Sequence, residues 1–223
     1  MRKIVSGLTV VLLLLGAGTI LAQDEERDIL EVSLYGGAGV PGGGLTDWRT
    51  GEQVGSPVDR AAKTGFDIGI DAGVFVTHRF LLGVNFVYTQ FPFDKELEQS
   101  GHNHRLYNPN VFVKYLFEGE SYWVPYVKGH IGIDFPKFST KVNNTAGRRF
   151  RELSYDLALG FGGGVGLFYY TADFSGLFIE ANYHYGLTEN VKADYENREY
   201  EFGKNLSLFD IHAGFRILFG SGD

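Results

Sequence analysis

The stretch FDIHAGFRILFGSGD, residues 209–223, alternates strictly between two kinds of position. One set of alternate positions up to residue 219 is wholly apolar, whereas the other set includes Asp210, His212 and Arg216. Because successive side chains of a β-strand point to opposite faces, this stretch predicts a strand with one apolar and one polar face. A strand of a soluble sandwich would bury the apolar face, and the rest of the sequence favours the opposite orientation.

Seven earlier segments repeat the two-residue alternation, and no helical period competes with it. The segments cover residues 29–40, 66–76, 81–91, 106–117, 123–135, 153–168 and 177–185. With the closing segment they make eight, an even number of candidate strands.

The connections between these segments alternate in length. Long ones span about residues 41–65, 92–105, 136–152 and 186–205, and short ones span about residues 77–79, 118–122 and 170–176. Long loops at one end and tight turns at the other are typical of outer-membrane β-barrels. In such a barrel the apolar face contacts lipid, the alternate positions fill the lumen, and closure pairs every backbone group. The sequence therefore predicts an all-β fold, an eight-stranded antiparallel up-and-down transmembrane β-barrel over residues 29–220, followed by a tail at 221–223.

The N-terminal residues 1–22 have the layout of a secretory signal peptide, with Arg2 and Lys3 before an apolar run and a small-residue end. Residues 23–28 would then form a short periplasmic leader. The chain has no cysteine, and its 27 acidic against 20 basic residues disfavour nucleic acid as a partner.

Charged residues recur on the face that would line the lumen. An eight-stranded barrel is only wide enough for side chains to fill it, so these charges are expected to form ion pairs. Closure makes the first and last strands neighbours, and we expect Glu31 to contact Arg216. The network is either a polar plug or a switchable ionic gate. Its expected members are Glu31, Asp71, Lys114, Lys128, Glu180 and Arg216.

Aromatic residues gather near the ends of the segments, where such barrels carry two interfacial girdles. Toward the short turns these are Tyr115, Phe117, Trp123, Phe168, Tyr169, Tyr170 and Phe219. Toward the long loops they are Tyr88, Phe91, Tyr107, Phe135, Tyr155, Tyr185 and Phe209.

The closing strand also carries a C-terminal pattern of a polar residue, a glycine, an apolar residue and an aromatic residue, at His212, Gly214, Ile217 and Phe219. With this pattern the chain resembles the small eight-stranded outer-membrane barrels, the family of the outer-membrane protein A transmembrane domain and outer-membrane protein X. The resemblance implies export to the bacterial outer membrane, contact with its lipid and lipopolysaccharide, and recognition of the last strand by the barrel-assembly machinery. The residues after Phe219 depart from the family, which usually ends at the aromatic residue.

Three motifs suggest other chemistry. GFGGGVG at residues 160–166 lacks the helix, lysine and hydroxyl of a phosphate loop, and its even-numbered glycines are expected to face the lumen. HNH at residues 102–104 has no third ligand at a metal-site spacing. An acyl hydrolase would need a Ser–His pair on the outer face, whereas His130, His184 and His212 share the inward register.

The predicted function is a non-enzymatic, monomeric outer-membrane scaffold with four long extracellular loops, without cofactor or metal. The third loop contains a basic run at residues 148–151, which is either solvated surface or a contact for lipopolysaccharide or another cell surface. A narrow or gated porin-like channel for ions or small solutes is the first alternative, and a lipid-A-modifying barrel enzyme is the second.

Overall fold

The computed structural model describes residues 28–43, 62–92, 103–117, 121–139, 153–154, 157–188, 191–195, 198–202 and 205–220. The predicted signal peptide, most of the leader, the basic run at 148–151 and the tail at 221–223 lie outside these residues. No helix among the described residues is long and apolar enough to cross a membrane.

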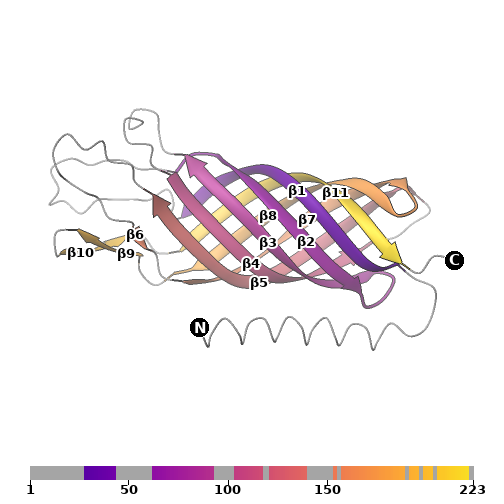
Figure 1. Cartoon of the computed structure of the whole chain (residues 1–223), viewed down its shortest axis with the longest axis horizontal. Helices are drawn as coiled ribbons and strands as arrows, with labels where there is room; N and C mark the ends of the chain where they lie inside the picture. Colours follow the sequence, from indigo (N-terminus) through magenta and orange to yellow (C-terminus); the bar gives the residue numbers. More distant parts are fainter. Residues whose placement is uncertain are drawn as a thin grey trace.

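Eight antiparallel strands form a closed barrel (Figure 1). Neighbours along the chain pair with one another around the barrel, and β1 pairs with β11 to close it. The predicted fold class is therefore confirmed. The strands are β1 (Asp28–Gly43), β2 (Gly65–Phe75), β3 (Phe80–Pro92), β4 (Asn103–Leu116), β5 (Trp123–Ser139), β7 (Ala158–Ala172), β8 (Ser175–Leu187) and β11 (Leu206–Gly220).

Three shorter strands were not predicted. β6 (Leu153–Ser154) pairs with the far end of β5, and β9 (Val191–Tyr195) pairs with β10 (Arg198–Phe202) in a separate hairpin within the fourth long connection. The predicted strand over residues 153–168 is thus shifted, because β7 begins at Ala158 and continues to Ala172 through a bulge that side-chain alternation does not reveal.

The strand ends that the long connections join lie at one end of the barrel, and the short turns lie at the other, as the sequence predicts (Figure 1). The turn after β2 spans residues 76–79, where the Thr77 hydroxyl accepts hydrogen bonds from the backbone amides of Arg79 (3.3 Å) and Phe80 (3.1 Å). The turn after β7 spans only residues 173–174. The side chains from all eight strands can therefore converge on one lumen.

The wall of the barrel is apolar outside and polar inside. On β11, Phe209 and Phe215 are 45% and 42% exposed, whereas Asp210 and Arg216 are 4% and 1% exposed. The hydrophobic effect would not leave such a wall bare in water, since large exposed apolar surfaces mark contact with lipid or a partner. The orientation predicted for the closing segment is confirmed.

Two aromatic girdles flank this wall, and their members differ in part from those predicted. Trp123 lies 4.5 Å from Tyr169 (ring centroids) near the short turns, and Tyr88 lies 5.1 Å from Tyr107 near the long loops. On β5, the twelve steps along the chain from Trp123 to Phe135 cover about 40 Å at about 3.3 Å per residue. A tilt of about 40° reduces this to about 30 Å, which is the thickness of a bilayer's hydrocarbon core.

Phe91 and Phe168 were assigned wrongly to these girdles. Both are fully buried and face the lumen, because they fall on the inward parity of β3 and β7. Tyr170 packs against Phe168 from the same side, with ring centroids 4.5 Å apart. Tyr155 lies outside the described residues.

Candidate functional site: the lumen of the barrel

Glu31 is the centre of the first group of charges in the lumen. Its Oε1 lies 2.6 Å from Nζ of Lys114, and its Oε2 lies 2.9 Å from Nε of Arg216. The hydroxyl of Ser33 donates a further hydrogen bond to Glu31 at 3.3 Å. β1 supplies Glu31 and Ser33, β4 supplies Lys114 and β11 supplies Arg216, and all four side chains are buried. One carboxylate is therefore shared by two cations that are removed from bulk water.

Lys128 is the centre of the second group. Its Nζ lies 2.7 Å from Oδ2 of Asp71 and 3.3 Å from Oε1 of Glu180. Tyr35 donates to Asp71 at 2.9 Å, and Asn182 donates to Glu180 at 2.7 Å. All six charged residues expected in the lumen are thus found there, as three acids and three bases in two contacting groups. The equal numbers of positive and negative side chains in these two groups fit the rule that buried charges need partners.

Aromatic rings join the two groups. The Phe112 ring lies between the two lysines, 5.5 Å from Nζ of Lys114 and 4.8 Å from Nζ of Lys128. The guanidinium carbon of Arg216 lies 4.2 Å from the centre of the Phe168 ring. The faces of these rings carry partial negative charge, so they stabilise the buried cations.

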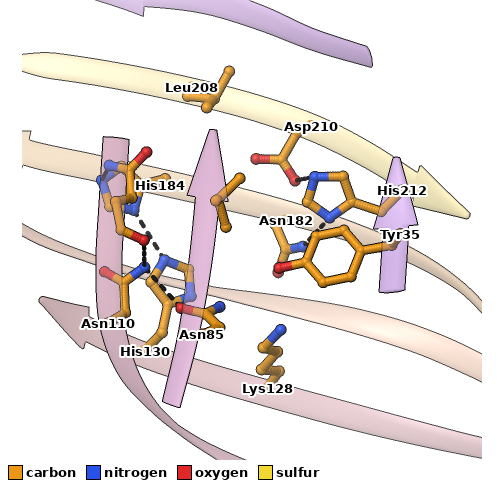
Figure 2. Close-up of a pocket in the computed structure, with 12 residues that line it drawn as sticks. Tyr35, Asn85, Asn110, Lys128, His130, Asn182, His184, Leu208, Asp210 and His212 are labelled. Atoms are coloured by element: carbon orange, nitrogen blue, oxygen red, sulfur yellow. Dashed lines mark hydrogen bonds and ion pairs between the residues drawn. The ribbon is translucent and has the colours of Figure 1, made fainter. Parts of the chain in front are cut away.

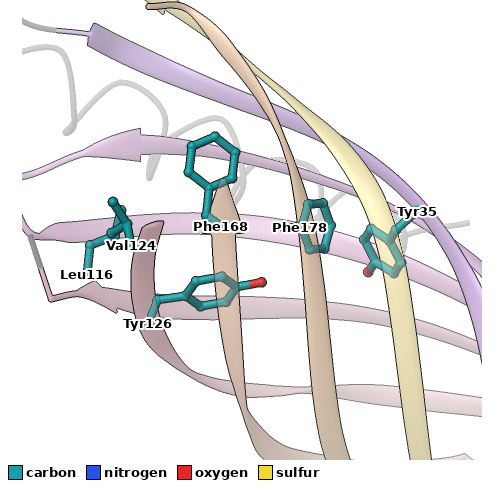
Figure 3. Packing of buried hydrophobic residues seen from close by; sticks show 6 residues of the cluster. All are labelled: Tyr35, Leu116, Val124, Tyr126, Phe168 and Phe178. Atoms are coloured by element: carbon teal, nitrogen blue, oxygen red, sulfur yellow. The ribbon is translucent and has the colours of Figure 1, made fainter. Parts of the chain in front are cut away.

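An apolar cluster fills the lumen at the short-turn end (Figure 3). The cluster was not predicted from the sequence, although the inward parity of Leu116 on β4 and of Val124 on β5 indicates it. A second cluster occupies the long-loop end, where Phe91 and Leu206 are among the buried members. The first cluster comprises Tyr35, Leu116, Val124, Tyr126, Phe168 and Phe178.

Between the clusters, His130 and His184 form a chain of hydrogen bonds that ends at Asp134, and Figure 2 shows the two histidines. Nε2 of His130 lies 2.9 Å from Nδ1 of His184, and the two rings are stacked with an interplanar angle of 6°. Nε2 of His184 lies 2.9 Å from Oδ2 of Asp134, which also accepts a hydrogen bond from Asn108 through Oδ1 at 2.6 Å. A hydrogen bond between two imidazoles requires that one nitrogen donates and the other accepts.

His212 forms a separate contact set. Its Nε2 lies 3.0 Å from Oδ1 of both Asp67 and Asp210, and its Nδ1 lies 3.3 Å from the amide nitrogen of Asn182. Within the described part of the chain, no group of His, Cys, Asp or Glu side chains has the geometry of a metal site. His102 of the HNH motif lies outside that part, and His104 is buried in the lumen.

Glycines make room for these large side chains. A Cβ on Gly162 would lie 2.6 Å from Nε2 of His130, and one on Gly166 would lie 2.7 Å from Cε1 of Tyr126. Both distances are too short for real contacts, so the even-numbered glycines of residues 160–166 face the lumen as predicted. Their role here is steric.

A small cavity lies among these side chains. The cavity beside His130, His184 and Asp210 measures about 30 Å³ (Figure 2). It has room for only a few water molecules, since about 10–15 Å³ of such space holds one. The side chains around it can hold charges and protons in place.

No family model and no curated protein matches this chain. Among solved structures, it is similar to Neisserial surface protein A, with a TM-score of 0.56 and 17% identity over 88% of this chain and 100% of that one. It is also similar to the outer membrane protein OprG from Pseudomonas aeruginosa, with a TM-score of 0.55 and 15% identity over 88% of this chain and 98% of that one. The outer membrane protein AlkL in lipid bilayers gives a TM-score of 0.52 and 14% identity over 90% of this chain and 95% of that one. These likenesses show a shared fold, the small outer-membrane β-barrel.

Proposed function

We propose that the chain is a monomeric bacterial outer-membrane protein, a non-enzymatic scaffold that presents four long extracellular loops above a plugged lumen. The observation that carries the proposal is the filling of the lumen. Six charged side chains are paired inside it, apolar clusters lie at both ends, and the cavity between them measures about 30 Å³. A barrel filled in this way can serve as a scaffold without conducting.

The wall of the barrel supports the membrane location. A closed barrel leaves no strand edge unpaired, which a bilayer requires because lipid offers no hydrogen bonds. Export through residues 1–22 and recognition of His212, Gly214, Ile217 and Phe219 by the barrel-assembly machinery are parts of the same proposal. Phe219 is 50% exposed on the outer wall, and His212 is buried in the lumen.

Two measurements test the scaffold. Detergent-folded protein should migrate differently on a gel before and after boiling, as intact barrels do, and an unshifted band would count against a membrane barrel. Planar bilayers containing the folded protein should then show no discrete openings. Steady openings in the wild-type protein would exclude a plugged scaffold.

A narrow gated channel is the second candidate, and the shared contacts of the charge network favour it. Glu31 contacts both Lys114 and Arg216, while Lys128 contacts both Asp71 and Glu180, so each group has alternative partners. A change of partners would open space without leaving a charge unpaired. The channel predicts discrete openings whose frequency changes in a Lys114→Gln variant and stays unchanged in a Lys137→Gln variant on the outer wall.

A further inference from the structure

Among the strand side chains that the structure describes, two charges lie on the outer wall of the barrel, and both are positive. Arg105 on β4 and Lys137 on β5 are paired in register, so their side chains lie next to one another on the lipid-facing side. Every other outward position of the eight strands whose side chain the structure describes is a glycine or another uncharged residue. A charge on the lipid-facing wall destabilises a barrel increasingly toward the middle of the membrane, so two adjacent charges require an explanation.

The pair lies at the level of the membrane surface next to the long loops. Arg105 is two residues from the start of β4, and Lys137 is two residues from the end of β5. The next row toward the middle of the wall is aromatic, with Tyr107 paired to both Tyr88 and Phe135. Aromatic rows mark the border between acyl chains and headgroups. The two cations are therefore placed beside lipid headgroups of the outer leaflet.

The two side chains are available to bind an anion. Neither forms an ion pair with a carboxylate in the described part of the chain, and the side chain of Arg105 is half-buried there. Lys137 is exposed, and its Nζ lies 5.8 Å from the centre of the Tyr107 ring. This contact holds the ammonium group on the wall and directs it toward the same surface as Arg105.

We propose that Arg105, Lys137 and Tyr107 form a binding site for the phosphorylated glycolipid of the outer leaflet, the lipid A part of lipopolysaccharide. The inference rests on the proposed outer-membrane location and adds a defined contact to it. A guanidinium binds phosphate oxygens through two parallel hydrogen bonds, and an ammonium group adds a point charge. The aromatic row below supplies apolar surface for the acyl chains that accompany the phosphate.

Native mass spectrometry of detergent-folded protein, titrated with bis-phosphorylated lipid A, tests the site. The Arg105→Gln/Lys137→Gln variant should bind lipid A at least about tenfold more weakly than the wild type, because two charge-assisted contacts are lost. Arg79→Gln serves as the control, since Arg79 is an exposed basic residue in the turn at the opposite end of the barrel. That variant should bind as the wild type does.

Three results would overturn the site. The double variant could bind lipid A as tightly as the wild type does, or the wild type could bind lipid A without phosphates as tightly as the bis-phosphorylated form. The two substitutions could also weaken the binding of phosphatidylglycerol as much as they weaken the binding of lipid A. A gel shift on boiling, measured on the same samples, separates the two proposals. If all variants keep the gel shift and the double variant binds lipid A as the wild type does, the proposed site is wrong and the proposed membrane barrel is unaffected.

Discussion

Glu31 on β1 contacts Arg216 on β11 across the seam at which the first and last strands close the barrel, with 2.9 Å between Oε2 and Nε. The two residues are 185 positions apart in the sequence, and the pairing of Ser33 with Arg216 places them diagonally on neighbouring strands. Because Glu31 also holds Lys114, the same carboxylate connects the seam to the opposite wall.

Glu31→Gln should therefore destabilise the barrel more than a typical surface change. The substitution leaves Lys114 and Arg216 buried without their partner, and breaking a buried ion pair costs about 3–5 kcal/mol. Urea unfolding of the protein in lipid vesicles, followed by the gel shift, measures the change. A second substitution, Lys114→Met, should restore part of the lost stability, and no recovery would contradict this assignment of the contact.

Gly162→Ala should destabilise the barrel, because the added methyl group meets the backbone carbonyl of Tyr183 and the ring of His130. Overpacking of this kind costs about 1–3 kcal/mol. Gly129→Ala is the matched control, because the nearest atom to its added Cβ would be Cγ1 of Val113, at 4.0 Å. The unfolding midpoint of Gly162→Ala should be lower than that of Gly129→Ala, and equal midpoints would show that Gly162 does not face a filled lumen.

Phe168→Ala should open a cavity in the apolar cluster near the short turns and remove the ring beside Arg216. Truncation of a buried phenylalanine costs about 3–5 kcal/mol. Phe161→Ala on the same strand removes a ring that is 41% exposed on the outer wall, so its effect on unfolding should be smaller. The same pair of variants in planar bilayers would show whether the cluster also blocks ion flow. If Phe161→Ala is the more damaging substitution, the inward orientation of Phe168 is wrong.

Val165→Arg tests the lipid-facing wall. Val165 is 61% exposed near the middle of β7, and a soluble protein would tolerate arginine at such a position. In a membrane, arginine at the midplane costs about 2–4 kcal/mol, falling to about 0–1 kcal/mol near the interface. Leu187→Arg, at the long-loop end of β8, should thus be milder when both variants are unfolded in vesicles. Equal tolerance of the two substitutions would argue against a membrane-embedded wall.

The sequence alone determined the closed barrel and which side of most strands faces inward. The alternation in β11 was sufficient to orient Asp210 and Arg216 toward the lumen, because side chains of a strand alternate whatever surrounds it. The contact of Glu31 with Arg216 followed from closure, which makes the first and last strands neighbours. The local pattern was sufficient in these cases, because the two-residue alternation shows which side chains of a strand share a face.

Only the tertiary structure decided which distant side chains meet. The inward orientation of Phe168 was available from the sequence, because Phe168 shares the even parity expected for the inward glycines of residues 160–166, and its assignment to a girdle from its position near the strand end was wrong. The contact of Lys128 on β5 with Asp71 on β2 crosses the lumen between strands that do not pair, and it depends on the tilt and stagger of the closed sheet. The adjacency of Arg105 and Lys137 likewise depends on the register of β4 with β5 across a long connection, a register that the alternation of either strand by itself leaves open.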